Sequence, residues 1–177
     1  LMNNQLITDP FISNNEEKLK WIEDKDWTYS TVFHLSKGEL KRKKANLVFE
    51  GLDTYADVYL NGKLIFSSDN MFTEYSNNVA HVLQENNTLE IQFKSAIKTA
   101  EPLFDAHDIR LPAGNDRNDK RTSVFTRKAP YQYGWDWGPR LVGAGIWKPV
   151  YLEFWDNISI QEPIITQKEL GNNIAKL

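Results

Sequence analysis

The sequence predicts an all-β domain: an antiparallel β-sandwich of the jelly-roll type with one or two short helices. Several short segments alternate apolar and polar residues with the period of two that a half-buried strand shows. Turn signals separate these segments, and Asn61-Gly62 is the strongest of them because both central positions of a type I′ turn need a positive φ. Strands do not alternate with long helices, which argues for antiparallel sheets rather than a parallel one.

Length and composition set limits on function. The chain has 177 residues, 41% hydrophobic and 25% charged, which suits one domain with a real core. Its net charge of -3 argues against nucleic acid as a partner, because phosphate binding needs a basic surface. No apolar run approaches the roughly 18 residues of a membrane span, so no membrane partner is expected. Cysteine is absent, which excludes disulfides and thiolate ligands, and no pattern predicts a cofactor.

The N-terminal part of the chain predicts a helix followed by a strand. Ser13 and Glu16 have the spacing of a capping box, and Leu19 and Ile22 give the helix a short apolar stripe. From residue 27 to residue 35 the pattern changes to the alternation of a strand. The helix is therefore an addition to a β domain.

The middle of the chain predicts the central strands. The five basic residues within 37–44 are interpreted as a solvated turn rather than a phosphate site, because strand-like segments flank them in an acidic chain. Residues 54–66 predict a hairpin, and a loop rich in asparagine separates it from a half-buried strand at 89–93. Helical spacing follows at 95–104, limited by proline, and 147–155 predicts a last strong strand.

The segment 105–120 is the least structured part of the pattern. It is charged and rich in turn residues, and a loop of this length in a compact domain is usually functional or mobile. Asp105, His107 and Asp108 could ligate a metal, but their spacing fits no closed site, so a polar loop and no metal are expected. Because 105–120 leads directly toward 131–140, the two segments are expected to rim the same end of the domain.

The segment Tyr131–Arg140 combines four aromatic residues, two glycines and a proline around one carboxylate, Asp136. Aromatic rings offer flat apolar faces, and a carboxylate accepts hydrogen bonds from adjacent hydroxyls, so this combination suits a carbohydrate. Glycine and proline favour a loop, where binding residues tend to lie. If the segment is extended, Trp135 and Trp137 point to one side and Asp136 to the other.

Several motifs resemble a known family. The segment Phe49–Lys63 resembles the core hairpin of the N-terminal sugar-binding-type domain of family-two glycoside hydrolases, which include β-galactosidases, β-glucuronidases and β-mannosidases. Further motifs resemble the β-mannosidases specifically, and they are Asp9-Pro10-Phe11, Asn15-Glu16, Asp26–Tyr29, Arg127-Lys128, Gly134–Pro139 and Gly145–Trp147. The resemblance covers nearly the whole chain, and its tryptophan-rich motif is the most specific part.

The resemblance implies a domain organisation and an activity for the parent protein. Residues 1–160 would form a galactose-binding-domain-like jelly roll lacking its first strands, and 161–177 a linker and the start of an immunoglobulin-like domain. The parent would be a retaining glycosidase that removes terminal β-linked mannose with two glutamates. Both glutamates belong to a catalytic barrel absent here, so no catalytic residue is expected. Asn15-Glu16 is interpreted as the start of a helix and not as the catalytic asparagine-glutamate pair of the family.

The same resemblance implies which residues reach the substrate. Trp135 and Asp136 would extend to the barrel and help to close the pocket around the terminal sugar. Asp136 has a second interpretation, in which it hydrogen-bonds backbone amides in a tight turn. Arg127 would pair with Asp136 or reach sugar hydroxyls. Three further aromatic residues are expected to be structural or to line the pocket, with packing favoured for the two tryptophans: Tyr133, Trp137 and Trp147.

Three classes of function follow. The leading one is the non-catalytic N-terminal domain of a β-mannosidase, with a mannoside or manno-oligosaccharide as substrate and the remaining domains of its own chain as partners. The second is an independent carbohydrate-binding module, or a domain of another family-two glycosidase such as a β-galactosidase. The third is a packing unit between domains without ligand contact. The sequence does not determine localisation, although an extracytoplasmic or lysosomal setting would suit glycan turnover.

Overall fold

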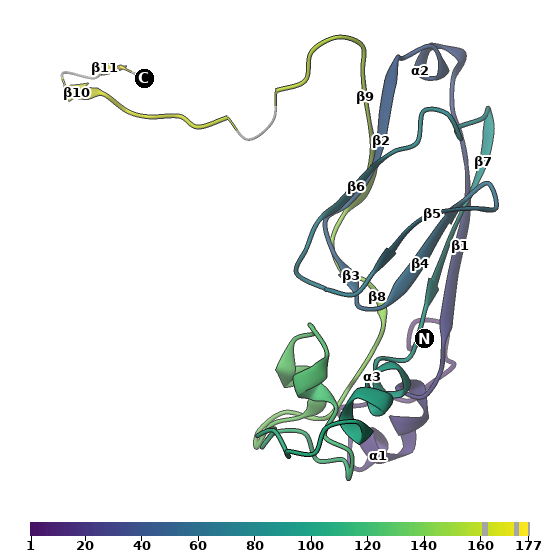
Figure 1. The fold of residues 1–177 in the computed structure, drawn as a ribbon, viewed down its shortest axis with the longest axis vertical. Helices are drawn as coiled ribbons and strands as arrows, with labels where there is room; N and C mark the ends of the chain where they lie inside the picture. The colour runs from purple at the N-terminus through teal and green to yellow at the C-terminus, as the bar shows by residue number, and fades with distance from the viewer. Residues whose placement is uncertain (161–162, 172–173, 177) are drawn as a thin grey trace.

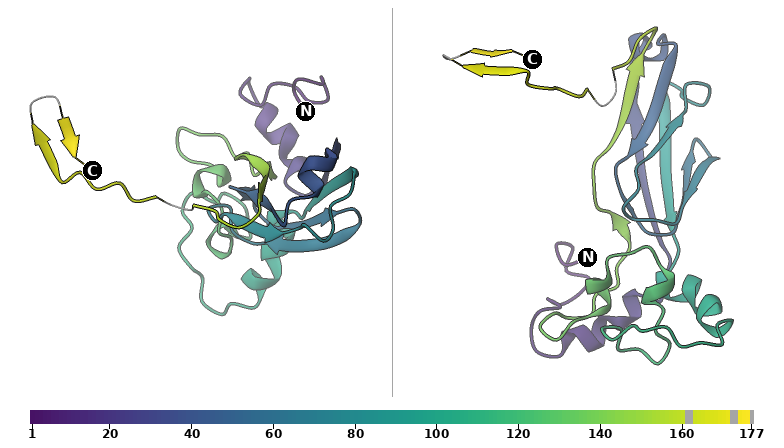
Figure 2. Two further views of the ribbon diagram at one scale, coloured as in Figure 1. Left: turned by 90° about the horizontal axis from the view of Figure 1, so that it is seen from above. Right: turned by 60° about the vertical axis from the view of Figure 1, so that its left-hand side comes forward.

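The computed structural model describes residues 1–160, 163–171 and 174–176. Figure 1 shows a β-sandwich whose lower end carries a lobe of short helices and loops. The lobe contains the N-terminal segment and the green part of the chain, and Figure 2 shows the same division from two further directions. Within the described residues, the sandwich strands are antiparallel to their neighbours, which confirms the predicted fold class.

Two sheets face each other in the sandwich. The first has four strands in the order β1 (Trp27–His34), β7 (Asn86–Phe93), β4 (Ala56–Leu60) and β5 (Lys63–Ser68). The second has three strands in the order β6 (Tyr75–Asn78), β2 (Lys44–Phe49) and β9 (Val150–Trp155). A short pair, β3 (Leu52–Asp53) and β8 (Gly145–Ile146), lies at the end of the sandwich next to the lobe.

The core lies between the two sheets and follows from the alternation in the sequence. In β7 every second residue is buried, and in β4 Ala56, Val58 and Leu60 are buried while their neighbours are half-buried. Phe49 of β2 and Phe93 of β7 are almost fully enclosed. Burying a large apolar side chain contributes roughly 1.5–3 kcal/mol to the free energy of unfolding. The buried side chains that face each other from the two sheets therefore dominate the stability of the sandwich.

The hairpin between β4 and β5 forms at the Asn61-Gly62 turn. Asn61 has φ 52° and Gly62 has φ 76°, as a type I′ turn requires. The Asn61 side chain also connects the turn to residues 82–88 of the same polypeptide. Its Nδ2 donates to the Val82 carbonyl at 2.9 Å, and its Oδ1 accepts from the Thr88 amide at 2.9 Å. The predicted hairpin is confirmed.

The asparagine-rich segment contains a strand that the sequence pattern did not predict. β6 pairs with β2 through Tyr75 opposite Phe49 and Asn77 opposite Leu47. Asparagine is depleted in strands, so local propensity favoured a loop. Packing overrides that propensity, because the Tyr75 ring stacks on Phe66 with centroids 5.2 Å apart.

The helices form near the expected positions but begin and end differently. α1 (Asn15–Leu19) continues into the 3₁₀ turn η1 (Lys20–Ile22), but its N-cap is Asn14 and has no side-chain cap. The capping box predicted at Ser13 and Glu16 is therefore wrong: Ser13 has φ 54°, and Glu16 Oε1 accepts from the Arg140 amide at 2.7 Å.

The basic segment is solvent-exposed as predicted, but it forms α2 (Lys37–Leu40) instead of a turn. Ser36 and Glu39 provide its capping box, which the sequence analysis did not identify. α3 (Ala96–Asp105) is capped by Ser95 and buries Ala96, Ile97 and Ala100. Pro102 lies inside α3 and the helix continues past it to Asp105, so the proline does not limit the helix as expected.

Past β9 the described chain runs away from the sandwich to a small hairpin. β10 (Glu169–Gly171) pairs with β11 (Ile174–Lys176), as Figure 1 shows at the yellow end of the chain. Residues 161–162, 172–173 and 177 of the predicted second segment lie outside the described residues. The assignment of 161–177 to a linker and a following immunoglobulin-like domain stays a prediction.

Candidate functional site

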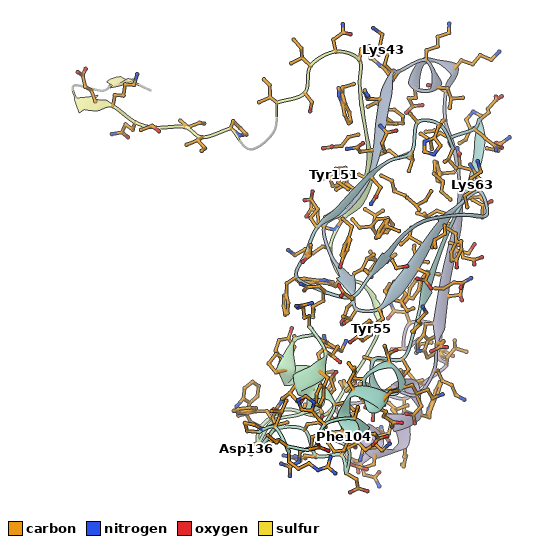
Figure 3. The ribbon with its side chains drawn as sticks, in the orientation of Figure 1. Lys43, Tyr55, Lys63, Phe104, Asp136 and Tyr151 are labelled. Carbon is orange, nitrogen blue, oxygen red and sulfur yellow. The ribbon has the colours of Figure 1, made fainter. Side chains whose placement is uncertain are left out.

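The aromatic segment lies in the loop lobe, at the end of the molecule where Figure 3 labels Asp136. It begins with the 3₁₀ turn η3 (Pro130–Tyr133), and Gly134 follows with φ 103°, a conformation that favours glycine. Trp135 and Gly138 then close a tight turn, with amide-to-carbonyl distances of 3.0 and 3.3 Å in the two directions. The segment is not extended, so the alternation predicted for an extended segment does not apply.

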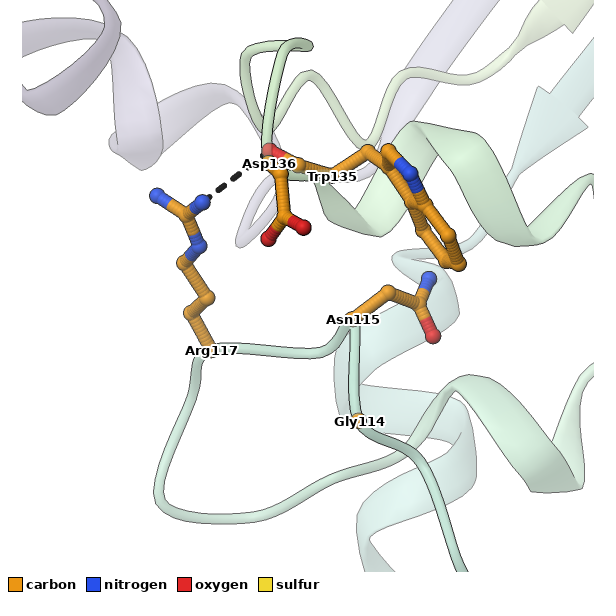
Figure 4. Close-up of a pocket in the computed structure, with 5 residues that line it drawn as sticks. All are labelled: Gly114, Asn115, Arg117, Trp135 and Asp136. Carbon is orange, nitrogen blue, oxygen red and sulfur yellow. Dashed lines mark hydrogen bonds between the residues drawn. The ribbon is translucent and has the colours of Figure 1, made fainter.

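A polar pocket of about 310 Å³ opens beside this turn. Its walls are Trp135 and Asp136 on one side and residues of the 105–120 loop on the other, namely Gly114, Asn115 and Arg117. Figure 4 shows the Asp136 carboxylate directed into the space between Arg117 and Asn115, with the Trp135 ring beside it. The expectation that the two segments rim the same end of the domain is confirmed.

Hydrogen bonds fix the two sides of the pocket to each other. The Arg117 Nη2 donates to the Trp135 carbonyl at 3.0 Å, and the Asn115 Nδ2 donates to the Pro130 carbonyl at 2.6 Å. Among the described residues, the Asp136 carboxylate has no protein hydrogen-bond partner. A turn aspartate that caps backbone amides would have one, so the structure does not support that interpretation of Asp136.

A second hollow, which is apolar and has a volume of about 320 Å³, also has Trp135 in its lining. Phe11, Tyr131, Trp137 and Leu141 contribute to its lining. The Trp137 side chain is 82% exposed and Trp135 is 47% exposed, so neither is a core residue within this chain. The large apolar surface of Trp137 faces outward in this chain, so the packing role expected for Trp137 stays a prediction.

A match between the sequence and a family model shows the family of this chain. A family model described as the galactose-binding domain-like domain of glycosyl hydrolase 2 matches residues 1–148. The chain belongs to this family. The resemblance inferred from the hairpin and the tryptophan-rich motif is confirmed at this level, and the domain is the galactose-binding-like domain of the family.

Individual relatives of this galactose-binding-like domain are β-mannosidases. Beta-mannosidase B from Emericella nidulans is 42% identical over 155 residues, and the β-mannosidase from Mus musculus is 38% identical over 152 residues. The crystal structure of a β-D-mannosidase from Dictyoglomus thermophilum superimposes on 88% of the chain with a TM-score of 0.82 and 44% identity. The matched region is 86%, 84% and 88% of this chain but only 18%, 17% and 19% of those proteins, respectively.

Two of the predicted aromatic residues make their contacts within the galactose-binding-like domain. Tyr133 is fully enclosed, and this burial raises the pKa of its phenol. Trp147 covers Gly51 and donates from Nε1 to the Met71 carbonyl at 2.9 Å, which connects the segment between β8 and β9 to the loop after β5. The packing role expected for Trp147 fits these contacts, although the residue is 45% exposed.

Arg127 lies away from the polar pocket. Its Nη1 is 3.8 Å from Asp69 Oδ2, both side chains are largely exposed, and its backbone bridges to Asn70. The ion pair with Asp136 considered for Arg127 is therefore not formed in the structure. Its contact with sugar hydroxyls, like those of Trp135 and Asp136, stays a prediction.

The 105–120 loop carries the pocket residues that the sequence analysis did not name, Asn115 and Arg117. The sequence pattern predicts this loop at the same end of the domain as the aromatic segment, but it gives no signal for which of the loop side chains face the pocket. Asp105 pairs with Lys120 Nζ at 2.7 Å, and the His107 ring packs edge-on against Phe125. Across the described residues, no three His, Cys, Asp or Glu side chains are grouped as a metal site would need. No described helix is both long and apolar enough to cross a bilayer.

Proposed function

We propose that this galactose-binding-like domain supplies one wall of the terminal-sugar pocket of a retaining β-mannosidase and is itself non-catalytic. The observation that carries the proposal is the Asp136 carboxylate, which projects into a polar pocket beside the Trp135 ring. The β-mannosidases that match this chain at 38–44% identity support the choice of mannose over other sugars.

The chemistry of the pocket suits a sugar hydroxyl. A carboxylate accepts hydrogen bonds from hydroxyls, and such bonds to a charged group contribute roughly 1.5–3 kcal/mol. We assign the Asp136 contact to the C2 hydroxyl, because its axial position distinguishes mannose from glucose and a site built for a hydroxyl discriminates strongly against its misplacement. The Trp135 ring offers an apolar face to the C–H surface of the same sugar. Arg127, outside this pocket, would reach only hydroxyls of a more distant sugar unit.

The rest of the pocket would belong to another part of the parent protein. The matched relatives are more than five times as long as the region they share with this chain, so they have room for a catalytic domain. Phe11, Tyr131 and Trp137 are 71%, 64% and 82% exposed around the apolar hollow next to Trp135. This apolar surface would pack against that catalytic domain. In the full-length protein the Trp137 fluorescence should therefore resist quenching by acrylamide, and free quenching would contradict the packing.

The substitution Asp136→Ala in the full-length protein tests the pocket role. Loss of one charged hydrogen bond should lower kcat/KM for a 4-nitrophenyl β-mannoside by roughly one to two orders of magnitude. Asp108→Ala is the matched control, because Asp108 is an exposed carboxylate of the same lobe that lines neither hollow. The loss should shrink for a 2-deoxy analogue, which has no C2 hydroxyl. Wild-type kcat/KM in Asp136→Ala, or an equal loss in Asp108→Ala, would refute the role.

The exposed aromatic residues also favour a second candidate, an independent carbohydrate-binding module. The two functions differ in the affinity of the isolated domain, because half of a cleft buries too little ligand surface for firm binding. Calorimetry with mannose and manno-oligosaccharides should therefore detect weak binding or none. The binding module would be favoured if the isolated domain bound these sugars with sub-millimolar affinity. A β-galactosidase would be favoured if the full-length protein hydrolysed β-galactosides faster than β-mannosides.

A further inference from the structure

The two sides of the polar pocket come from segments that are joined by one buried arginine, Arg140, which is not part of the pocket lining. Its side chain is 2% exposed and lies between two buried carboxylates. The Nε donates to Glu23 Oε2 at 2.9 Å, and the Nη1 donates to Asp116 Oδ1 at 2.7 Å. Glu23 follows the N-terminal helix, whereas Asp116 lies between the pocket residues Asn115 and Arg117.

Arg140 also holds its own segment in place. Its Nη1 donates to the Tyr133 carbonyl at 3.2 Å, and its guanidinium lies 5.4 Å from the centre of the Tyr133 ring. Its backbone amide donates to Glu16 Oε1 at 2.7 Å. These contacts fix both ends of the short stretch 133–140, which contains Trp135 and Asp136.

The Asp116 carboxylate has a second partner that makes its position specific. Its Oδ2 accepts from the Ser123 amide at 3.0 Å while its Oδ1 accepts from Arg140. Both oxygens are thus acceptors, and the residue has no exposed surface. An asparagine of the same shape would direct an N–H₂ group at one of these two donors.

From these contacts we propose that Arg140 and Asp116 are positioning residues for the sugar pocket. They set the distance between the Trp135-Asp136 turn and the Asn115-Arg117 loop, and neither residue lines the pocket. This inference rests on the proposed function, because it assigns sugar binding to the pocket whose walls they align. A planar guanidinium can serve two carboxylates at once, whereas a lysine ammonium in its place is a point charge that reaches one of them.

The test uses Asp116→Asn, Arg140→Lys and Leu60→Ala in the full-length protein. Leu60 is fully buried in β4, so its substitution lowers stability without touching the lobe. Hydrogen exchange of peptides that cover 113–118 is measured by mass spectrometry, together with kcat/KM and the melting temperature. We expect exchange in 113–118 to rise at least about tenfold in Asp116→Asn and Arg140→Lys. We expect kcat/KM to fall about 10- to 100-fold, since small misplacements of binding groups have effects of that size.

The control separates positioning from general destabilisation. Leu60→Ala should lower the melting temperature at least as much as Asp116→Asn and leave the exchange of 113–118 and kcat/KM near wild type. The proposal would be overturned if hydrogen exchange of 113–118 stayed at the wild-type rate in both Asp116→Asn and Arg140→Lys. It would also be overturned if Leu60→Ala changed this exchange and kcat/KM as much as those two variants do. If Asp136→Ala keeps full activity, the proposed function is wrong, and the exchange of 113–118 alone then decides whether Arg140 and Asp116 align the two segments.

Discussion

Lys128 offers the sharpest test of how the lobe is joined to the sandwich. Its side chain has no exposed surface, and its Nζ donates to Asp53 Oδ1 at 2.6 Å and to the Gly143 carbonyl at 2.7 Å. Asp53 belongs to β3, whereas Lys128 lies just before η3 and Gly143 lies just before β8. Asp53 Oδ2 also accepts from Gln132 Nε2 at 2.9 Å, so the carboxylate is the centre of the junction.

The substitution Lys128→Met removes the ammonium and keeps most of the side-chain volume. It leaves the Asp53 carboxylate, which is 9% exposed, without its cation. Breaking a buried pair from one side costs about 3–5 kcal/mol, because the remaining charge stays desolvated. For a domain of this size each kcal/mol lowers the melting temperature by roughly 2–4 °C, so a decrease of about 6–20 °C is expected.

The double variant Lys128→Met/Asp53→Asn identifies the cause. A neutral amide is much less costly to bury than an unpaired carboxylate, so the second substitution should restore part of the lost stability. Urea unfolding of the 177-residue chain, followed by circular dichroism, gives the free energies for all four members of the cycle. A loss below about 1 kcal/mol in Lys128→Met, or a double variant less stable than Lys128→Met alone, would show that the buried charge pair is not what joins the lobe to the sandwich.

Lys128 also predicts a pH dependence with a definite sign. Burial lowers the pKa of Lys128 below 10.5, and the neighbouring Asp53 only partly opposes this. Between the lowered value and 10.5 the unfolded chain binds the proton that the folded chain has lost, so this group makes stability rise with pH in that interval. The difference in unfolding free energy between wild type and Lys128→Met should therefore widen as the pH increases toward 10.5.

Two further predictions concern the sandwich. In Gly51→Ala the new Cβ would overlap Trp147 Nε1, so Trp147 must move and lose its hydrogen bond to the Met71 carbonyl. We expect the free energy of unfolding in urea to fall by about 1–3 kcal/mol. Wild-type stability of this variant would contradict the close packing of Trp147 on Gly51. Hydrogen bonds from Lys94 and Ser67 lower the pKa of Asp57 below 3.8, so its contribution to stability is complete above pH 3.8 and is lost as the pH falls through the lowered value. Acid titration of Asp57→Asn should show a smaller loss of stability in that interval, and an unchanged acid transition would show that the pair contributes nothing.

The sandwich could be predicted from the sequence because its signals are local. Alternation marks β4 and β7, and the Asn61-Gly62 pair fixes the hairpin because its backbone conformation suits few other residues. β6 was missed for the opposite reason. Its asparagines disfavour a strand, and only the pairing with β2 and the stacking of Tyr75 on Phe66 hold it in the sheet.

The capping box shows how one motif can fit two places. Ser13 and Glu16 have the required spacing, but Glu16 binds the Arg140 amide, 124 residues away in sequence, instead of the start of its own helix. Ser36 and Glu39 form the actual box in a segment interpreted as a charged turn. Sequence spacing identifies residues that are able to cap, whereas tertiary contacts decide which of them do so.

In the candidate site, too, some residues can be recognised from local sequence and others only from tertiary contacts. Trp135 and Asp136 could be predicted because their chemistry is concentrated in one short segment, and the 105–120 loop was placed at the same end because it leads into that segment. Arg140 ends the motif in the sequence, where it looks like an ordinary polar residue of a loop. Its partners Glu23 and Asp116 are 117 and 24 residues away, so no local pattern connects them. Trp135 and Asp136 of the pocket wall thus stood out in the sequence, whereas Asn115, Arg117 and the buried charges that join the two segments became visible only when the chain was folded.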